Sequence, residues 1–229
     1  MARFGLPPFD SLDGPPAKTP PEAHTLHCVP IVPPRFLYLV RHGETDWNAA
    51  ERWQGHTDIP LNATGRAQAR ALAQTLRSLG FAGVVASDLS RAQETAHIVA
   101  AELGLRVAYV DAALRERSFG CFEGLTREEC DRLHPVAWRA WLADRRAPEG
   151  GEPHESLTAR VVAGVARAAQ VVARDDAPAL VVTHGGSLRA VVAAATGKLP
   201  GPVKNTEVWR VTWEEGLVGA EPLEAAHLV

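Results

Sequence analysis

The chain has 229 residues, enough for one full-sized core, and 46% of them are apolar while 22% are charged, as is usual in globular domains. These proportions exclude a fibrous repeat and wholesale disorder. The formal net charge of −3 provides no overall basic field to attract nucleic acid or an anionic membrane, so any anionic ligand has to be bound by a local site.

The cysteines and the absence of targeting signals point to a reducing compartment. Cys28, Cys121 and Cys130 show no paired spacing, which favours free thiols. Pro7 and Pro8 interrupt the first residues, so the apolar stretch of a secretory signal is missing. No segment reaches the ~18 uncharged apolar residues that a membrane-spanning helix needs. We therefore expect a cytoplasmic protein with no membrane partner.

The N-terminal segment, residues 1–34, is rich in proline and contains nine of the chain's 17 prolines. Each proline removes a backbone donor and fixes φ, so a flexible or polyproline-like extension is predicted here, followed by one domain over residues 35–229. His24, His27 and Cys28 lie in the extension without a second ligand pair at a recognisable spacing. No metal site is expected there.

From Phe36 onward, short apolar runs alternate with segments of helical periodicity. In chain order, strands are predicted over residues 36–40, 83–87, 107–110, 179–183 and 208–213. Helices are predicted over residues 64–80, 90–103, 156–173 and 187–196, and a mostly helical stretch is expected around Trp138 and Trp141. Thr64 is expected to cap the first helix, and Gly80 to end it. This alternation predicts an α/β fold, a three-layer α/β/α sandwich with a mostly parallel sheet.

Three of the predicted strands end in residues that suit catalysis. The first runs into residues 41–45 (Arg-His-Gly-Glu-Thr), the second into residues 87–91 (Ser-Asp-Leu-Ser-Arg), and the fourth into Thr183, His184 and Gly185. Functional groups of open α/β sheets collect beyond the carboxyl ends of the strands. Each motif alone is an ordinary polar turn, whereas together they are predicted to bring two histidines and two arginines to one edge.

These motifs, together with residues 114–117 (Leu-Arg-Glu-Arg), resemble the signature of the histidine phosphatase superfamily, which includes the cofactor-dependent phosphoglycerate mutases. The resemblance spans residues 36 to about 213. It implies a phosphoglycerate mutase-like three-layer fold and a phosphohistidine mechanism with no metal and no cofactor. It further implies His42 as nucleophile and Glu116 as proton donor and acceptor. The phosphate pocket that it implies consists of Arg41, Arg91 and His184, with hydrogen bonds from Asn48 and the backbone near Thr45.

The chemistry of phosphate esters asks for the same residue types. Arginine neutralises a phosphate dianion with two parallel hydrogen bonds and stays charged at any working pH. Imidazole is a nucleophile only while one ring nitrogen is unprotonated, and a hydrogen bond from the other nitrogen to a backbone carbonyl selects that form. The leaving oxygen needs a proton, for which Glu116 is the candidate and Glu44 and Asp88 are the rivals.

The choice between the phosphatase and the mutase branch of the superfamily rests on weaker sequence signals. Gly186 and Phe119 stand where the mutases typically have Asn and Tyr, and after Arg210 the tail carries only acidic charges, which suit a lid over a bisphosphate poorly. Arg145 and Arg146 can substitute for the paired arginines of the mutases. We therefore expect a phosphomonoester hydrolase, with a mutase and an inactive phosphate-binding or interaction module as the alternatives.

The expected ligand is a small-molecule phosphate ester, and no nucleic acid partner is expected. Its leaving group and the oligomeric state are left open by the sequence. Gln54, Gly185 and Phe119 are predicted to form the substrate rim. Further rim candidates, each of which can equally be a packing or solvent-exposed residue, are Phe122, Arg127, Trp138 and Arg189.

Overall fold

The computed structural model describes residues 1–2 and 33–224, and all of its helices and strands lie within the unit Val32–Val229. Most of the predicted proline-rich extension, including His24, His27 and Cys28, lies outside the described residues. Among the described helices, none combines the length and the apolar character needed to cross a bilayer.

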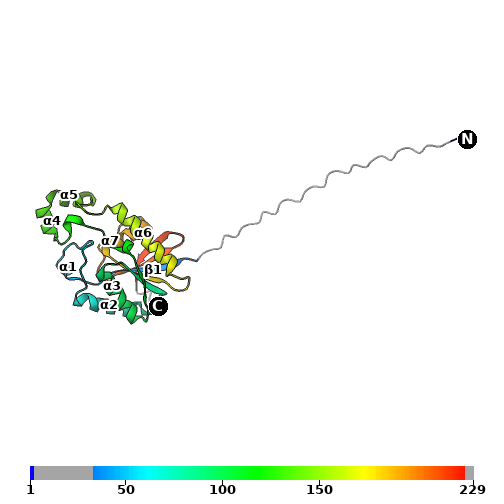
Figure 1. Cartoon of the computed structure of the whole chain (residues 1–229), viewed down its shortest axis with the longest axis horizontal. Helices are drawn as coiled ribbons and strands as arrows, with labels where there is room; N and C mark the ends of the chain where they lie inside the picture. Colours follow the sequence, from blue (N-terminus) through cyan, green and yellow to red (C-terminus); the bar gives the residue numbers. More distant parts are fainter. Residues whose placement is uncertain (3–32, 225–229) are drawn as a thin grey trace. The chain divides into compact units, whose positions relative to one another are not determined.

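A six-stranded sheet forms the middle of the domain, in the order β3-β2-β4-β1-β5-β6 (Figure 1). The first four strands in that order are parallel, β5 is antiparallel to β1, and β6 is antiparallel to β5. The strands are β1 (Arg35–Arg41), β2 (Gly83–Ala86), β3 (Val107–Val110), β4 (Ala179–Thr183), β5 (Val208–Trp213) and β6 (Leu217–Pro222). The mostly parallel sheet is confirmed.

Helices cover both faces of the sheet. On one face, α2 (Ala63–Leu76) and α3 (Ser90–Glu102) pack against a cluster that includes Tyr38 and Val40. On the other, α6 (His154–Val171) and α7 (Gly185–Thr196) pack against a cluster that includes Leu37 and Leu39. Successive residues of β1 therefore point to opposite layers and all four are buried, as a central strand requires. The predicted three-layer sandwich is confirmed.

A smaller cluster caps one end of the sheet and is built from α4 (Arg127–Leu133), α5 (Pro135–Asp144) and the loop around Phe119. Phe122 and Trp138, predicted as possible rim residues, are buried in this cluster, so packing is their role. The predicted helical stretch around Trp138 and Trp141 is thus one helix, α5, preceded by the short α4. Short helical turns complete the structure: α1 (Asp46–Ala49), η1 (Arg77–Leu79), η2 (Ala112–Leu114) and η3 (Gly120–Phe122).

One prediction about the elements was wrong, and one strand was missed. Asn62, not Thr64, caps α2, because the Asn62 side chain accepts a hydrogen bond of 2.8 Å from the amide of Gly65. The strand β6 was not predicted, since it contains Gly219 and ends at Pro222, residues that weaken a strand signal and are tolerated at a sheet edge. The remaining strands and long helices start or end within a few residues of their predicted limits.

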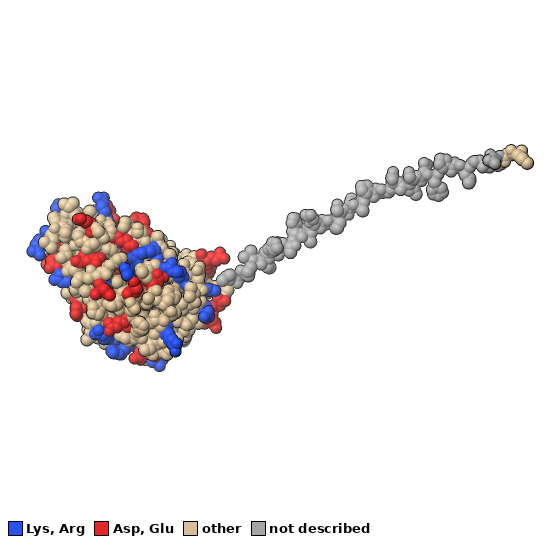
Figure 2. All heavy atoms as spheres, viewed as in Figure 1, with Lys and Arg blue, Asp and Glu red and all other residues tan. Residues whose placement is uncertain are grey.

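Acidic and basic side chains are interspersed over the surface seen in Figure 2, in keeping with the small net charge. The acidic residues that follow Arg210 belong in part to β6, where Glu221 pairs with Arg210 across the strands. In the described part of the chain, this tail therefore extends the sheet.

The start of α2 lies directly against the loop after β1. A Cβ atom at Gly65 would lie 2.1 Å from the carbonyl oxygen of Glu44, and one at Gly43 would lie 2.5 Å from the carbonyl oxygen of Gly65. Both contacts are with backbone, which cannot move aside as a flexible side chain can. Only glycine fits at these two positions.

We predict that Gly65→Ala destabilises the protein by about 1–3 kcal/mol, because the added methyl group forces α2 away from the loop that carries His42. Urea denaturation measures the effect. Gly201→Ala is the matched control, since a Cβ at Gly201 meets nothing within 4 Å. Equal unfolding midpoints for the two variants would show that the close packing at Gly65 is unimportant.

Candidate active site

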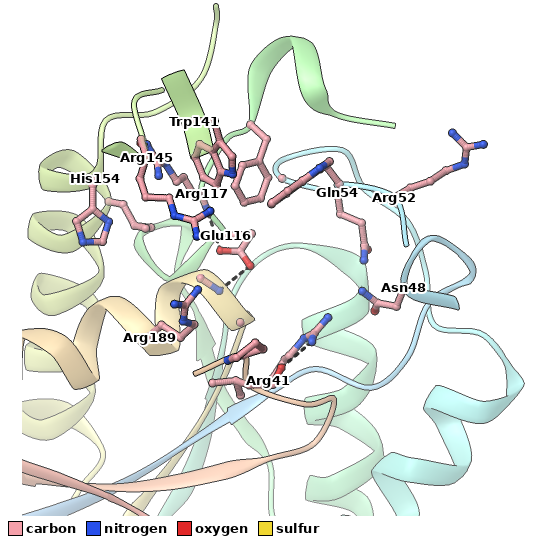
Figure 3. A pocket seen from close by; sticks show the side chains of 18 of the residues that line it. Arg41, Asn48, Arg52, Gln54, Glu116, Arg117, Trp141, Arg145, His154 and Arg189 are labelled. Atoms are coloured by element: carbon pink, nitrogen blue, oxygen red, sulfur yellow. Dashed lines mark hydrogen bonds between the residues drawn. The ribbon is translucent and has the colours of Figure 1, made fainter. Parts of the chain in front are cut away.

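The register of the sheet brings two histidines together at its carboxyl edge. Arg41 is the pairing partner of Thr183 across β1 and β4, so the residues that follow the two strands lie side by side. The rings of His42 and His184 are 5.1 Å apart between centroids. Above them opens a cavity of 880 Å³, drawn in Figure 3.

Most of the predicted site residues line this cavity: Arg41, His42, Asn48, Gln54, Arg91, Glu116, Phe119 and Gly185, together with the rim candidates Arg127 and Arg189. His184 and Thr45 are fully buried and are not part of the cavity wall. Parts of the chain that are far apart in sequence therefore meet where the motifs predicted.

His42 is held in the form that the predicted chemistry requires. Its Nδ1 lies 2.6 Å from the carbonyl oxygen of Gly43, and because a carbonyl only accepts, Nδ1 carries the proton and Nε2 keeps its lone pair. Burial and the charges of Arg91 and Arg41 hold the pKa of His42 well below its usual value. The ring is therefore a neutral imidazole at neutral pH.

His184 lies beneath His42 and is also neutral. Its Nε2 is 2.9 Å from the hydroxyl oxygen of Ser87, which itself accepts from the amide of Leu89. The Ser87 hydroxyl can then donate to Nε2, which leaves the proton on Nδ1, a buried atom without a partner among the described residues. Burial, with Arg91 and His42 nearby, keeps the pKa of His184 well below its usual value. Of the two roles the chemistry allows it, cation or donor, this site supports the neutral donor.

Arg91 and Arg41 are anchored by backbone carbonyls. The Arg91 guanidinium donates to the carbonyl oxygens of Thr57, at 3.0 Å, and Gly55, at 2.8 Å. The Arg41 guanidinium donates to that of Val203 at 2.8 Å. In both side chains Nε is buried without a partner in the described part of the chain.

Arg91 forms no ion pair within 4 Å with a described carboxylate, and Glu116, Asp58 and Glu123 act on its charge only at longer range. Glu94, on the same helix, is bound to Arg66 at 2.6 Å. Burial lowers the pKa of Arg91 to about 10, so the side chain is still charged at neutral pH. The cavity floor thus offers several donors and positive charge to an anion, and the buried Nδ1 of His184 is a further unpartnered donor close to His42 among the described residues.

Asn48 is fixed by the short helix α1. The amide and the hydroxyl of Thr45 both donate to its Oδ1 at 3.2 Å, and the Asn205 side chain donates to the same oxygen. This oxygen therefore accepts only from groups of the protein, and the side-chain nitrogen Nδ2 of Asn48 is left to donate to a ligand. Thr45 acts here by positioning Asn48, because its own donors are already engaged. Asn205, which also donates to the carbonyl of His42, was missed by sequence reasoning because no motif surrounds it.

Glu116 is the carboxylate of the cavity wall. Its Oε1 accepts from the amide of Arg117 at 2.8 Å, and its Oε2 accepts from the amide of Gly186 at 2.9 Å, the contact dashed in Figure 3. A Cβ at Gly186 would clash with Oε1, so a larger residue there requires the Glu116 side chain to move. The larger residue typical of the mutases does not fit while Glu116 stays in place.

The two rival carboxylates are engaged elsewhere. The Asp88 side chain forms two hydrogen bonds with Arg115, and these hold its pKa below the usual value. The Glu44 side chain accepts from Asn62 at the start of α2. Neither residue lines the cavity. Glu116 is therefore the one of the three candidates that can exchange a proton with a ligand.

A second layer of side chains supports these groups and was not predicted. Arg160 on α6 donates to the carbonyl oxygen of Glu116 at 2.7 Å and is paired with Glu152. Glu123 accepts from the amides of His56 and Thr57, and so fixes the loop whose carbonyls anchor Arg91. Sequence patterns carry no signal for such contacts, since each joins residues that are far apart in the chain. Among the described residues, no cluster of three metal-ligating side chains is present.

The cap contributes the outer wall of the cavity. Trp141 packs edge to face against Trp53 and Phe119, and Trp53 and Phe119 pack in a tilted arrangement, with ring centroids 4.6 to 5.6 Å apart. Arg117 and Arg145, neither of them predicted as a rim residue, lie over the Trp141 ring at 4.7 and 5.4 Å. The outer wall of the cavity is thus both aromatic and cationic.

Comparison with known proteins agrees with this geometry. The family model of the histidine phosphatase superfamily (branch 1) matches residues 37–219. Phosphoglycerate mutase-like protein 4 of Arabidopsis thaliana is 38% identical over 163 residues, which cover 69% of this chain and 70% of that protein. The probable phosphoglycerate mutase GpmB of an Enterobacter strain is 37% identical over 194 residues, which cover 78% of this chain and 85% of that protein.

Similar solved structures include phosphatases. A mycobacterial glucosyl-3-phosphoglycerate phosphatase has 33% identity and a TM-score of 0.71, covering 82% of this chain and 97% of that one. A putative α-ribazole-5′-phosphate phosphatase from Escherichia coli has 29% identity and a TM-score of 0.70, and the match covers 82% of this chain and 94% of that one. With the family model matching most of the chain and the two histidines meeting at the sheet edge, the protein is a member of the histidine phosphatase superfamily.

Proposed function

We propose that the protein is a phosphomonoester hydrolase that works through a phosphohistidine on His42. The observation that carries this proposal is that the His42 ring is neutral, with Nδ1 bound to the Gly43 carbonyl and Nε2 unprotonated. The ring lies beside donors of Arg41, Arg91 and His184 that have no partner among the described residues. A nucleophile next to a preformed anion pocket is what phosphoryl transfer requires. The phosphatase names of the structural neighbours support the same reaction.

The reaction follows in two steps. The donors of Arg41, Arg91, His184 and Asn48 bind the phosphate oxygens, and Nε2 of His42 attacks phosphorus. The bond to the leaving oxygen breaks with its electron pair, and the carboxylic acid of Glu116 gives that oxygen a proton. In the second step a water attacks phosphorus, the Glu116 carboxylate takes its proton, and the bond from phosphorus to Nε2 breaks. Inorganic phosphate leaves, and both residues return to their first state.

The mutase is the second candidate, because the curated relatives carry phosphoglycerate mutase names. A mutase has to keep water away from the phosphohistidine and hold a bisphosphate. The cavity wall includes no described residue beyond Val203, and the tail forms β6 at the sheet edge. Such a site admits water, which favours hydrolysis. Incubation with 3-phosphoglycerate and a catalytic bisphosphate separates the two, since isomer formation without phosphate release would identify a mutase.

An inactive binding module, the third reading, would need neither nucleophile nor acid. Here His42 and Glu116 are present, and both are oriented by backbone hydrogen bonds. A pocket used only to bind phosphate has no reason to fix a proton donor in this way, so the enzymatic reading is the stronger.

We predict that His42→Ala lowers p-nitrophenyl phosphate hydrolysis by at least about 10³-fold, because the nucleophile is lost. The wild-type protein, quenched during turnover, should carry acid-labile phosphate that the variant lacks. His97→Ala is the control, since His97 is exposed on α3 and bonds only to its own helix. Equal rates for wild type and His42→Ala would refute the covalent mechanism.

Glu116→Gln is predicted to reduce kcat for alkyl phosphates by about 10²–10⁴-fold, because an alkoxide leaves poorly without a proton. With p-nitrophenyl phosphate, whose leaving group needs no proton, the first step should survive and the second should slow. Rapid-mixing kinetics would then show a burst of nitrophenol. Glu128→Gln, at an exposed position on α4, serves as the control. The same loss for both classes of ester, without a burst, would contradict the assigned role.

The neutral histidines make stability sensitive to acid. In the folded state the pKa values of His42 and His184 lie well below the value of about 6.5 that they have when unfolded. Below pH 6.5 the unfolded chain therefore binds protons that the folded chain does not, and stability falls by at most about 1.4 kcal/mol per pH unit and histidine. Urea unfolding between pH 7.5 and 5 should show a shallower loss for His42→Asn than for the wild type. Parallel curves would mean that His42 is protonated in the folded protein.

A further inference from the structure

The arginines of the cavity differ from the arginines elsewhere in the domain. Of the eight arginine ion pairs in the described part of the chain, only that of Arg52 with Glu129 involves an arginine of the cavity. Six cavity arginines therefore have no carboxylate partner within 4 Å: Arg41, Arg91, Arg117, Arg127, Arg145 and Arg189. The proposed phosphate pocket accounts for the first two.

Three of the others form a group, here called the arginine triad: Arg117, Arg145 and Arg189. Arg117 donates to the carbonyl oxygens of Glu152 and Arg145, and Arg189 donates through Nε to that of Pro200. The Arg145 side chain makes no hydrogen bond to a described residue and lies over Trp141. Each guanidinium thus keeps N–H groups that no described residue accepts.

The triad concentrates positive charge, and no described carboxylate forms an ion pair with it within 4 Å. Burial is the main cause that lowers the pKa of Arg117 and Arg189, and the nearby charge of Arg145 lowers both further. Nearby carboxylates are already engaged, because Asp144 is paired with Arg146 and Glu152 with Arg160. The exposed Glu155 on the cavity wall forms no ion pair with any of the three. Such an arrangement is stabilised when an anion binds.

The position of the triad relates it to the leaving group. The backbone amide of Arg117 donates to Glu116, and Arg189 lies on α7 three residues after Gly186, whose amide donates to the other carboxylate oxygen. Figure 3 shows Arg117, Arg145 and Arg189 on one side of Glu116, with Asn48 and Gln54 on the other. The group that receives the proton of Glu116 therefore leaves next to the triad.

We propose that the arginine triad is a binding subsite for a second anionic group on the substrate, so that preferred substrates are phosphate monoesters whose leaving group carries a carboxylate or a second phosphate. The identity of the ligand as a phosphate ester rests on the proposed function. Guanidinium forks with free N–H groups bind both kinds of anion by paired hydrogen bonds. A cavity of 880 Å³ has room for a leaving group that reaches from Glu116 to the triad.

Matched substrate pairs test this subsite. 3-Phosphoglycerate and glycerol 3-phosphate share a carbon skeleton and differ in one carboxylate, and fructose 1,6-bisphosphate and fructose 6-phosphate differ in one phosphate. We expect kcat/KM to be at least about tenfold higher for the more anionic member of at least one pair, and the pair that responds identifies the anion. Arg145→Gln and Arg189→Gln should each remove about tenfold of that preference, mainly through KM. Rates with p-nitrophenyl phosphate should stay within about twofold, because that ester has no second anion.

Two controls separate charge from structure. Arg146→Gln changes the neighbouring arginine, which is exposed and paired with Asp144, and should leave every rate unchanged. Arg189→Lys keeps the charge without the fork and should retain part of the preference that Arg189→Gln loses. Loss of the preference in Arg146→Gln as well, or equal loss of p-nitrophenyl phosphate hydrolysis in the Arg145 and Arg189 variants, would overturn the subsite.

A binding measurement keeps this inference separate from the proposed function. In a His42→Ala background, calorimetry should show about tenfold tighter binding of the more anionic member of the responding pair, and Arg189→Gln should remove the difference. Absence of hydrolysis by the wild type, with this binding difference intact, would refute the hydrolase and leave the subsite. Hydrolysis of p-nitrophenyl phosphate without preference in either rates or binding would refute the subsite and leave the hydrolase.

Discussion

The parallel pairing of β1 with β4 is the constraint on which the site depends. Arg41 lies opposite Thr183, and the amide of His42 donates to the carbonyl oxygen of Thr183 at 2.9 Å. A shift of one residue would turn every side chain of β1 to the opposite layer and separate the two histidine rings. Since both faces of these strands are buried under helices, that shift is excluded by the hydrophobic core. The catalytic geometry is in this sense a consequence of packing.

Around the two rings, the protein holds positive charge on arginines that form no ion pair within 4 Å with a described carboxylate. Arg41 and Arg91 are oriented by backbone carbonyls, which fix a guanidinium without cancelling its charge. Burial and the same field keep His42 and His184 neutral, the state in which the proposed mechanism uses one ring as nucleophile and the other as donor. Carboxylate partners in these places would weaken the attraction for a phosphate dianion. Preorganised charge of this kind lowers a barrier because no groups have to reorient during the reaction.

The position of the Glu116 carboxylate is fixed by backbone amides. Its two oxygens are held by the amides of Arg117 and Gly186, and its own carbonyl is held by Arg160. Gly186 leaves room for the carboxylate because it has no side chain. The Glu116 carboxylate, the arginines beside it and the start of α7 therefore form one connected unit, in which the position of the carboxylate and the charge of the outer wall are set together.

The sequence by itself determined the alternation of strands and helices, the three-layer class, and the identity of His42, Arg91, Glu116 and His184 as candidates, because apolar periodicity and strand-end motifs are local signals. It did not reveal Asn205, Glu123 or Arg160, and it assigned Phe122 and Trp138 to a possible rim although both are buried in the cap. It also left open which of three carboxylates lines the cavity. The tertiary structure decided these points, because hydrogen bonds and charge balance between residues far apart in the chain exist only once the sheet and its helices have brought them together.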